Sequence, residues 1–229
     1  YSIQNPKIYF KSNLEGFFNI LELTRKNKIK HLIFASTSSV YGDSNKFPLK
    51  EQSNTDKPLS FYAATKKSNE VMAHSYSHIY RIPCTAVRFF TVYGPNGRPD
   101  MALFKFTKNI LENKPIHLFN FGKHVRDFTY IDDVVGGIFK IIKKNPKFKI
   151  PFDIFNIGNG NPKKLIEYLN QIEKNLNKTA KIKKLPLQVG DVFKTHADIG
   201  KLNKKINYRS KTNINDGVKK FVEWYLENY

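Results

Sequence analysis

The sequence predicts an α/β protein built on a parallel β-sheet. Three apolar runs, Leu32–Ala35, Cys84–Phe90 and Phe152–Ile157, have the length and composition of buried strands. Stretches with helical spacing lie between them, and this alternation is typical of parallel sheets. The first two runs break into hydroxyl and turn residues, which is where open sheets of this class bind ligands.

The remaining elements follow from apolar periodicity and from capping residues. Helices are predicted over Tyr9–Lys26, Tyr62–Tyr80, Ala102–Glu112, from an Asp132 or Asp133 cap to about Lys144, near Pro162–Asn175 and over Ile214–Tyr229. From Ile116 onward the pattern is more mixed, with a segment Val125–Phe128 that carries Arg126 and Asp127 and a short strand predicted over Ile182–Leu185. The loops Asp43–Pro58 and Thr91–Pro99 are rich in turn residues.

Length and composition indicate a globular protein. The 229 residues suffice for one large domain or one and a half, and 40% of them are hydrophobic. No apolar run approaches the roughly 18 residues of a membrane helix, so no membrane partner is expected. The single cysteine, Cys84, lies in an apolar run and is expected in the core. A reducing, cytoplasmic location fits that cysteine use.

The net charge of +20 raises the alternative of a nucleic-acid partner. Most of the 39 basic residues are lysines scattered along the chain, so we expect them on solvated faces and predict no nucleic-acid binding. A positive field would instead attract a small anionic ligand.

Tyr62 and Lys66 form the candidate acid-base pair. They stand four residues apart on a predicted helix, so both side chains lie on one face. A phenol with a pKa near ~10 is a poor base at neutral pH, and an adjacent ammonium favours the phenolate. The same spacing also arises as a solvated lysine beside a half-buried tyrosine. His74 and His78 share this spacing, but they lack a third ligand, so no metal site is predicted.

Five motifs in order give the chain a recognisable family resemblance. They are Phe34–Gly42, Tyr62–Lys66, Arg88–Pro95, Gly97–Ala102 and Arg126–Asp133. With them the chain resembles the extended short-chain dehydrogenase/reductase family of nucleotide-sugar enzymes, and most closely its UDP-glucuronate 4-epimerases.

The resemblance implies the C-terminal part of a doubly wound parallel-sheet (Rossmann) domain plus a smaller mixed α/β substrate domain. Residues 1–95 would be the remainder of the NAD-binding domain. Residues 96–229 would mainly bind the nucleotide sugar, with short returns to the first domain at about 125–157. The glycine-rich turn that holds the NAD pyrophosphate is not found, so we expect an N-terminally truncated chain that lacks roughly ninety residues.

The resemblance also assigns roles to residues. Tyr62 would be the base, Lys66 would lower its pKa and hold the cofactor ribose, and Thr37 would hydrogen-bond the reacting oxygen. The implied NAD contacts are Asn13, Ala35, Ser36, Tyr62, Lys66 and Phe89. The implied substrate contacts are Ser38, Ser39, Thr91, Arg98, Arg126, Gln188 and Asp191, with Arg126 on the diphosphate and Asp191 on the ribose.

The neighbours of Thr37 discriminate between sister reactions of the family. Dehydratases need carboxylates directly after this threonine, and decarboxylating relatives carry an acid before the Val-Tyr-Gly. Here these positions are Ser38 and Ser39, so both reactions are disfavoured. Neutral hydroxyls with Thr91 and Arg98 suit a sugar carboxylate.

The function expected is therefore NAD-dependent C4 epimerisation of UDP-glucuronate to UDP-galacturonate through a 4-keto intermediate. Two alternatives remain open: an epimerase of another UDP-hexose, and a catalytically incomplete UDP-sugar-binding fragment. Relatives pair through helices that correspond to Tyr9–Lys26 and Tyr62–Tyr80, so a homodimer is expected.

Overall fold

The computed structural model describes residues 2–229, which form two compact units. Unit 1 comprises Tyr1–Phe90, Gly136–Ile157 and Ala197–Tyr208, and unit 2 comprises Thr91–Val135, Gly158–His196 and Arg209–Tyr229. Both units are assembled from three separate stretches of chain. The functional domains expected at 1–95 and 96–229 stay a prediction.

Unit 1 contains the predicted parallel sheet. Its strands are β1 (Leu32–Thr37), β2 (Cys84–Phe89) and β7 (Phe152–Ile157), in the order β1-β2-β7. Both pairs are parallel, so the carboxyl ends of all three strands meet at one edge. Thr37, Phe89 and Ile157 are register partners at that edge. The α/β class with a parallel sheet is thereby confirmed.

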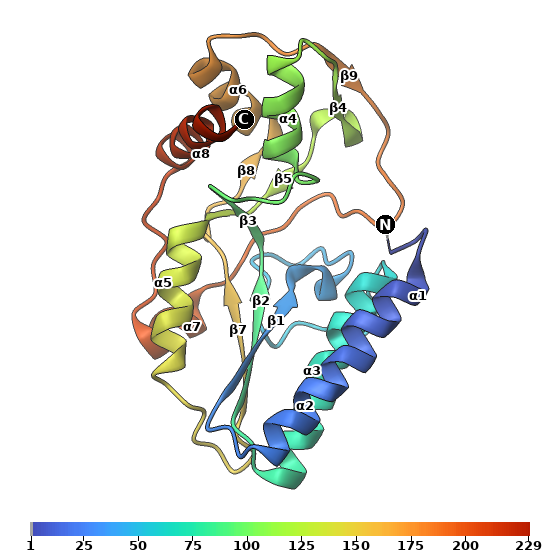
Figure 1. Ribbon diagram of the computed structural model, residues 1–229, viewed down its shortest axis with the longest axis vertical. Coiled ribbons are helices and arrows are strands. Elements are labelled where there is room, and N and C mark those ends of the chain that lie inside the picture. The colour runs from blue at the N-terminus through green and yellow to red at the C-terminus, as the bar shows by residue number, and fades with distance from the viewer. Residues whose placement is uncertain (1) are drawn as a thin grey trace. The chain divides into compact units, whose positions relative to one another are not determined.

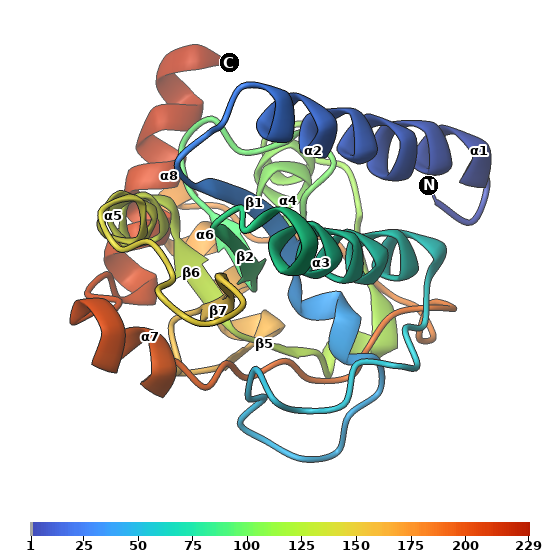
Figure 2. The ribbon, with the colours of Figure 1, turned by 90° about the horizontal axis from the view of Figure 1, so that it is seen from below.

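Unit 1 also contains helices beside its sheet (Figures 1 and 2). They are α1 (Pro6–Tyr9), the π-helix η1 (Phe10–Glu15), α2 (Gly16–Lys26), the 3-10 helix η2 (Ser38–Tyr41), α3 (Phe61–Tyr80) and α7 (Gly200–Ile206). Helices α2 and α3 lie side by side, α3 packs on the strands, and α7 packs on β7. The core between α2, α3 and the sheet includes Leu21, Ala73 and Cys84, all fully buried.

Unit 2 is a smaller mixed α/β unit. Its strand pairs are β3 (Thr91–Tyr93) with β6 (Phe128–Tyr130), β4 (Ile116–Leu118) with β9 (Ile182–Lys184), and β5 (Val125–Arg126) with β8 (Lys163–Lys164). Its helices are α4 (Ala102–Leu111), the 3-10 helix η3 (Phe119–Gly122), α6 (Leu165–Leu176) and α8 (Ile214–Asn228). Helix α5 (Ile131–Ile142) begins in unit 2 and ends in unit 1.

An aromatic core holds unit 2 together. Helix α6 packs against both α4 and α8. Tyr168 of α6 is 1% exposed, and its ring centroid lies 5.2 Å from that of Tyr93 and 3.6 Å from that of Phe128. The aromatic side chains of β3, β6 and α6 therefore form one buried cluster, which holds these two strands against the helix.

Several sequence-based predictions of elements were wrong in detail. Neither Asp132 nor Asp133 caps α5, because the helix already begins at Ile131 and both lie inside its first turn. Asp133 instead accepts hydrogen bonds from Ser210, Lys211 and Thr212. The Thr91–Pro99 loop begins with strand β3, since Thr91–Tyr93 pair with β6.

Other differences involve the starts and ends of helices. The helix expected near Pro162 begins at Leu165, because Lys163 and Lys164 extend to pair with β5. Helix α7 was not predicted, since its seven residues span barely two turns. Across residues 2–229 no helix combines the length and the apolar character that crossing a bilayer requires.

Candidate active site

The carboxyl end of β1 presents a row of hydroxyl groups. Thr37 is the last residue of the strand and the N-cap of η2. Its Oγ accepts a hydrogen bond from the Ser39 amide and donates one to Ser39 Oγ, both at 3.2 Å. Ser38 and Ser39 are half-buried, whereas Thr37 is buried. The hydroxyls of Thr37 and Ser39 are thus held together at the start of η2, which follows the strand directly.

Lys66 reaches back from α3 to this strand end. Its Nζ donates a hydrogen bond of 2.9 Å to the carbonyl of Ala35. Partial burial lowers the pKa of this ammonium. Ser60 caps the start of α3 by accepting from the Ala63 amide at 3.2 Å, which fixes the register in which Tyr62 and Lys66 share a face.

The Tyr62 phenol is half-buried and lies beside α1. Its ring meets that of Tyr9 edge to face, with centroids 6.0 Å apart. Among residues 2–229 the phenol makes no hydrogen bond to Lys66 or to Thr37. Unit 1 therefore brings Lys66 and Thr37 to the same strand end and places Tyr62 one helical turn before Lys66.

Asn13 lies in the π-helix η1, a class of helical irregularity that is frequent at functional sites. Its side-chain amide donates to Thr65 Oγ at 2.9 Å, and Thr65 Oγ donates to the carbonyl of Tyr62 at 2.8 Å. These hydrogen bonds link η1 to the backbone of the candidate base. The proposed cofactor contact of Asn13 is not tested by this arrangement.

A buried ion pair under the strand ends escaped the sequence analysis. Arg88 of β2 donates two hydrogen bonds of 2.8 Å to the carboxylate of Glu70 on α3. Ser36 Oγ donates to the same carboxylate at 2.6 Å, so this implied NAD contact has its hydroxyl engaged within the protein. Ala35 is exposed and Phe89 is half-buried at the same strand ends. The sequence signal that could have revealed this ion pair is Arg88, a single arginine inside an otherwise uncharged strand.

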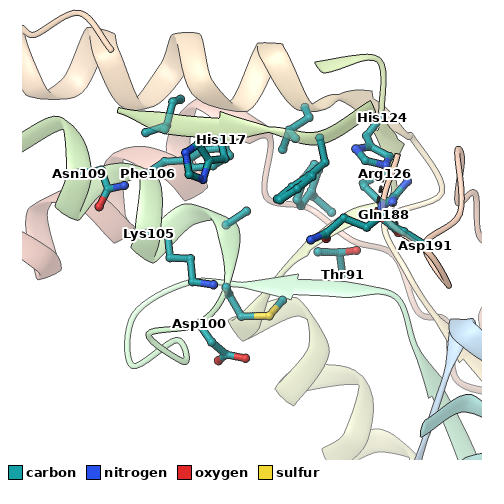
Figure 3. Close-up of a pocket in the computed structure, with 16 residues that line it drawn as sticks. Thr91, Asp100, Lys105, Phe106, Asn109, His117, His124, Arg126, Gln188 and Asp191 are labelled. Atoms are coloured by element: carbon teal, nitrogen blue, oxygen red, sulfur yellow. Dashed lines mark hydrogen bonds and ion pairs between the residues drawn. The ribbon is translucent and has the colours of Figure 1, made fainter. Parts of the chain in front are cut away.

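Unit 2 contains a cavity of about 630 Å³ that is lined only by residues of this unit (Figure 3). One part of its lining is apolar and includes Phe106, Ile116, Phe119, Phe128 and Leu165. The other part is polar and includes Thr91, His124, Arg126, Gln188 and Asp191. A partly apolar cavity with a few convergent polar groups is the usual form of a small-molecule site. Four of the implied substrate contacts therefore share one cavity: Thr91, Arg126, Gln188 and Asp191.

Arg126 and Asp191 form an ion pair in this lining. Arg126 Nη2 lies 2.7 Å from Asp191 Oδ1, and its other terminal nitrogen donates to the carbonyls of Val125 and Phe193. Burial lowers the pKa of Arg126 despite the neighbouring carboxylate. Burial alone would raise the pKa of Asp191, but the contacts with His124 and Arg126 outweigh it and the pKa is lowered.

His124 completes the polar part of the cavity and was not identified from the sequence. The residue is 4% exposed, and its Nε2 lies 3.1 Å from Asp191 Oδ2. The two atoms are close enough for a hydrogen bond, but their angles do not meet hydrogen-bond geometry. Within residues 2–229 this nitrogen therefore has no hydrogen-bond partner. A histidine two residues before the motif arginine was the signal available in the sequence.

Arg98 lies elsewhere in unit 2. Its guanidinium pairs with the Asp100 carboxylate at 2.7 Å and 3.0 Å, and its side chain is 74% exposed. It is absent from the cavity lining, although Asp100 and Met101 belong to it. No cluster of three metal-binding side chains occurs in the part of the chain that the structure describes.

Comparisons with known proteins place these features in a family. Residues 1–158 match the model of the NAD dependent epimerase/dehydratase family. The chain is 49% identical to Protein CapI of Staphylococcus aureus and covers 73% of that protein. It is 43% identical to a Rhizobium meliloti protein named Probable UDP-glucuronate 4-epimerase and covers 72% of it. Both alignments span 100% of this chain.

A solved structure agrees with these relatives. The UDP-glucuronic acid 4-epimerase from Bacillus cereus, in complex with UDP-glucuronic acid and NAD, superposes with a TM-score of 0.90 at 33% identity. The superposition covers 96% of this chain and 69% of that chain. The chain thus belongs to the NAD-dependent epimerase/dehydratase family, as the motifs indicated.

Proposed function

We propose that this protein is an NAD-dependent UDP-sugar 4-epimerase whose substrates are UDP-glucuronate and UDP-galacturonate. The observation that carries the proposal is the hydrogen bond of Lys66 to Ala35, two residues before Thr37 at the end of β1, with Tyr62 one helical turn before Lys66. Family membership and the names of the relatives support it, since two of them name this activity.

The residues at the end of β1 fit the nicotinamide half of NAD. Lys66 has three N–H groups, and in the described chain it uses one of them, toward Ala35. A half-buried cation with two remaining donors at the edge of a parallel sheet suits ribose hydroxyls. When bound, NAD supplies a hydride acceptor that later returns the hydride. Lys66, Ala35 and Phe89 would hold that part of the cofactor.

Each catalytic side chain has a distinct task. Tyr62 takes the proton of the sugar C4 hydroxyl and gives it back at the end. The hydride that leaves C4 also returns to C4, so the net redox change is zero. Lys66 lies one helical turn after Tyr62 on α3, and its ammonium would hold the cofactor ribose. Thr37 donates a hydrogen bond to the oxygen on C4, which requires its hydroxyl hydrogen to turn away from Ser39 Oγ, while the Ser39 amide holds its oxygen in place. The sugar passes through a 4-keto form between the two proton transfers.

Unit 2 supplies the nucleotide site. Its apolar lining suits a base, Arg126 suits the diphosphate, and Asp191 accepts from ribose hydroxyls. Gln188 occupies a cavity position where it donates or accepts without adding charge. The net charge of +20 raises the local concentration of an anionic nucleotide sugar.

The choice of a uronate rests on neutral hydroxyls around the sugar. Ser38 and Ser39 leave elimination and decarboxylation without an acid-base group, while Thr91 lies in the cavity lining. Arg98 would pair with the sugar carboxylate, which requires it to exchange its present partner Asp100. The pairing is solvent-exposed and therefore costs little to break.

The uronate assignment predicts the effect of Arg98→Ala. This variant should raise the KM for UDP-glucuronate about tenfold and leave the KM for UDP-glucose nearly unchanged, because only the first substrate has a carboxylate. A coupled assay that compares both substrates measures this. Equal losses for the two sugars would reject the carboxylate role and favour the alternative of another UDP-hexose.

The central experiment tests the base. Tyr62→Phe should lower kcat for 4-epimerisation by about 10²–10⁴-fold, because the general base is removed. Tyr80→Phe makes the same change at the far end of α3 and should leave kcat unchanged. Calorimetric titrations with NAD and with UDP accompany the assay. Full activity of Tyr62→Phe contradicts the proposal.

A non-catalytic nucleotide-sugar binder is the second candidate. The observation that favours it is that the whole cavity lining belongs to unit 2, so nucleotide binding does not require the residues of unit 1. Binding of UDP without binding of NAD would support this candidate over the enzyme.

We also propose a cytoplasmic homodimer. Large apolar side chains are exposed on the outer surfaces of α2 and α3, among them Phe18 at 48%, Leu23 at 55%, Val71 at 58% and Ile79 at 61%. Burying them against the same helices of a second copy would remove this surface from water. The free, buried Cys84 fits a reducing compartment.

A further inference from the structure

We propose that His124 binds a ribose hydroxyl of the nucleotide together with Asp191, and so makes the site selective for ribonucleotides. The proposal rests on the nucleotide-sugar function proposed above and adds a residue to it. It starts from an imidazole nitrogen and a carboxylate oxygen that lie 3.1 Å apart in the cavity lining of unit 2 without a hydrogen bond between them.

The backbone fixes His124 toward the cavity. Its carbonyl accepts from the Leu165 amide at 2.9 Å, and the next residues form the β5–β8 pair. Alternate residues of an extended segment face the same side, so His124 projects with Arg126. Figure 3 shows both side chains at the end of the cavity that holds Asp191, with His117 at the opposite end.

The two groups offer one donor and one acceptor. Since Asp191 Oδ2 lies 3.1 Å from His124 Nε2, this nitrogen carries the hydrogen of the ring, because two acceptors would repel each other. Asp191 Oδ1 already accepts from Arg126 and from the Val192 amide, which leaves Oδ2 for a ligand.

A hydroxyl group matches this pair better than a phosphate does. One hydroxyl donates to the carboxylate and accepts from the imidazole at the same time. A phosphate oxygen next to Oδ2 would suffer charge repulsion. His124 is 4% exposed, so an unmet N–H here is costly, and a ligand that satisfies it gains affinity. In a nucleotide sugar, the ribose next to the base carries two such hydroxyls, on C2′ and C3′.

The test compares UDP with its 2′-deoxy and 3′-deoxy analogues by calorimetry on this chain. All three ligands share the base and the diphosphate, so the ratio of their dissociation constants reports only the hydroxyls. The unsubstituted protein should bind UDP about tenfold more tightly than at least one of the analogues. His124→Phe keeps the ring shape but removes the donor, so the ratio should fall about threefold or more.

Two further variants serve as controls. His124→Gln retains an N–H and should keep a ratio closer to that of the unsubstituted protein. His117→Phe makes the same change at the other end of the cavity and should leave the ratio unaltered. Because each ratio is measured on one preparation, partial misfolding of a variant does not distort it.

The outcomes separate this proposal from the proposed function. If UDP binds but no analogue is discriminated, or if the ratio in His124→Phe falls less than about threefold, the role of His124 is overturned. The same holds if His117→Phe changes the ratio as much as His124→Phe does. If the unsubstituted protein does not bind UDP at all, the nucleotide-sugar function itself fails.

Discussion

Arg88 and Glu70 show how single residues secure the strand ends. Both side chains are 2% exposed, and Arg88 lies 4.8 Å above the ring of Tyr41. Burial would lower the pKa of Arg88, but the hydrogen bonds to Glu70 and the electrostatic interactions with the Tyr41 phenol group and the Glu70 carboxylate raise it above its ordinary value. The pair joins α3 to β2. It also joins α3 to β1, because Ser36, the residue before Thr37, donates a hydrogen bond to Glu70.

Removing one partner of this pair should be strongly destabilising. Glu70→Gln leaves the buried Arg88 charge uncompensated and should lower the free energy of unfolding by about 3–5 kcal/mol. Urea unfolding measures this. Glu112→Gln, in the exposed pair with Lys114, should leave the stability nearly unchanged. Equal effects of the two variants would contradict the structural role of the buried pair.

At the residue scale the sequence indicated local motifs better than long-range pairs. Tyr62 and Lys66 stand within one turn of a helix, so their shared face follows from spacing alone. Glu70 and Arg88 meet only because α3 packs on β2, and His124 meets Asp191 across 67 positions of sequence. Such contacts are set by tertiary packing, which no local pattern encodes.

Among the elements, α8 approaches β3 closely at one glycine. A Cβ on Gly217 would overlap the hydroxyl end of Tyr93, with Cζ only 2.8 Å away. Tyr93 is 7% exposed and packs among aromatic rings, so it cannot move aside cheaply. The glycine therefore sets the distance between the helix and the strand.

Two glycine variants should act in opposite directions. Gly217→Ala should destabilise the protein by about 1–3 kcal/mol through overpacking. Gly136→Ala in α5 meets nothing within 4 Å and should stabilise it by about 0.5–1 kcal/mol, because alanine favours helices. Thermal melts of both variants measure this. Stabilisation by Gly217→Ala would show that the Tyr93 side chain moves aside at little cost.

Helices α2 and α3 are linked by a carboxylate whose charge matters. Glu22 accepts from Arg25 at 2.8 Å and from Tyr76 at 2.8 Å, and these contacts lower its pKa from 4.5 to about 2. A carboxylate with a lowered folded-state pKa adds stability above its unfolded pKa and loses it as the pH falls through the folded value.

The pH dependence of Glu22→Gln should follow that window. The melting temperature of the unsubstituted protein should exceed that of the variant at pH 6, and the difference should disappear as the pH falls from about 4.5 to about 2. High salt should shrink the difference, because the group is near the surface. A difference that is the same at pH 2 and pH 6 would contradict this account.

Long periodic elements were predictable, whereas short ones were not. Tyr62–Tyr80 was expected as a helix and α3 spans Phe61–Tyr80, and Phe152–Ile157 forms β7 as predicted. The helix expected over Tyr9–Lys26 contains the π-helix η1 at Asn13. Within it Asn13 donates a hydrogen bond to Thr65, which lies 52 residues away, and no local pattern encodes such a contact. Pairs of two or three residues such as β5 and β8 have too little periodicity to detect.

At the scale of the whole molecule, the proposed homodimer predicts the effect of a surface charge. Val71→Glu on α3 should convert the dimer to a monomer, since the carboxylate would be buried unpaired in the apolar interface. Light scattering after size-exclusion chromatography measures the mass. Phe139→Glu, at a 63% exposed residue of α5, should leave the dimer intact. A monomeric unsubstituted protein contradicts the proposal.

The interleaving of the two units was beyond the reach of sequence analysis. Strand β7 joins the sheet of unit 1 after the chain has passed through Thr91–Val135 of unit 2. Composition does not shift at these crossings, because both units use the same lysine-rich surface. The family resemblance, rather than periodicity, indicated two functional regions.

The chain passes between the two units five times, and this has a consequence for biosynthesis. A ribosome releases the chain from the N-terminus, so unit 1 lacks its third strand until Ile157 has emerged and lacks α7 until Ile206 has emerged. By then the first two stretches of unit 2 have also left the tunnel. Folding during translation therefore finishes both units close together in time, and a nascent chain stalled before β7 exposes an open sheet edge to chaperones.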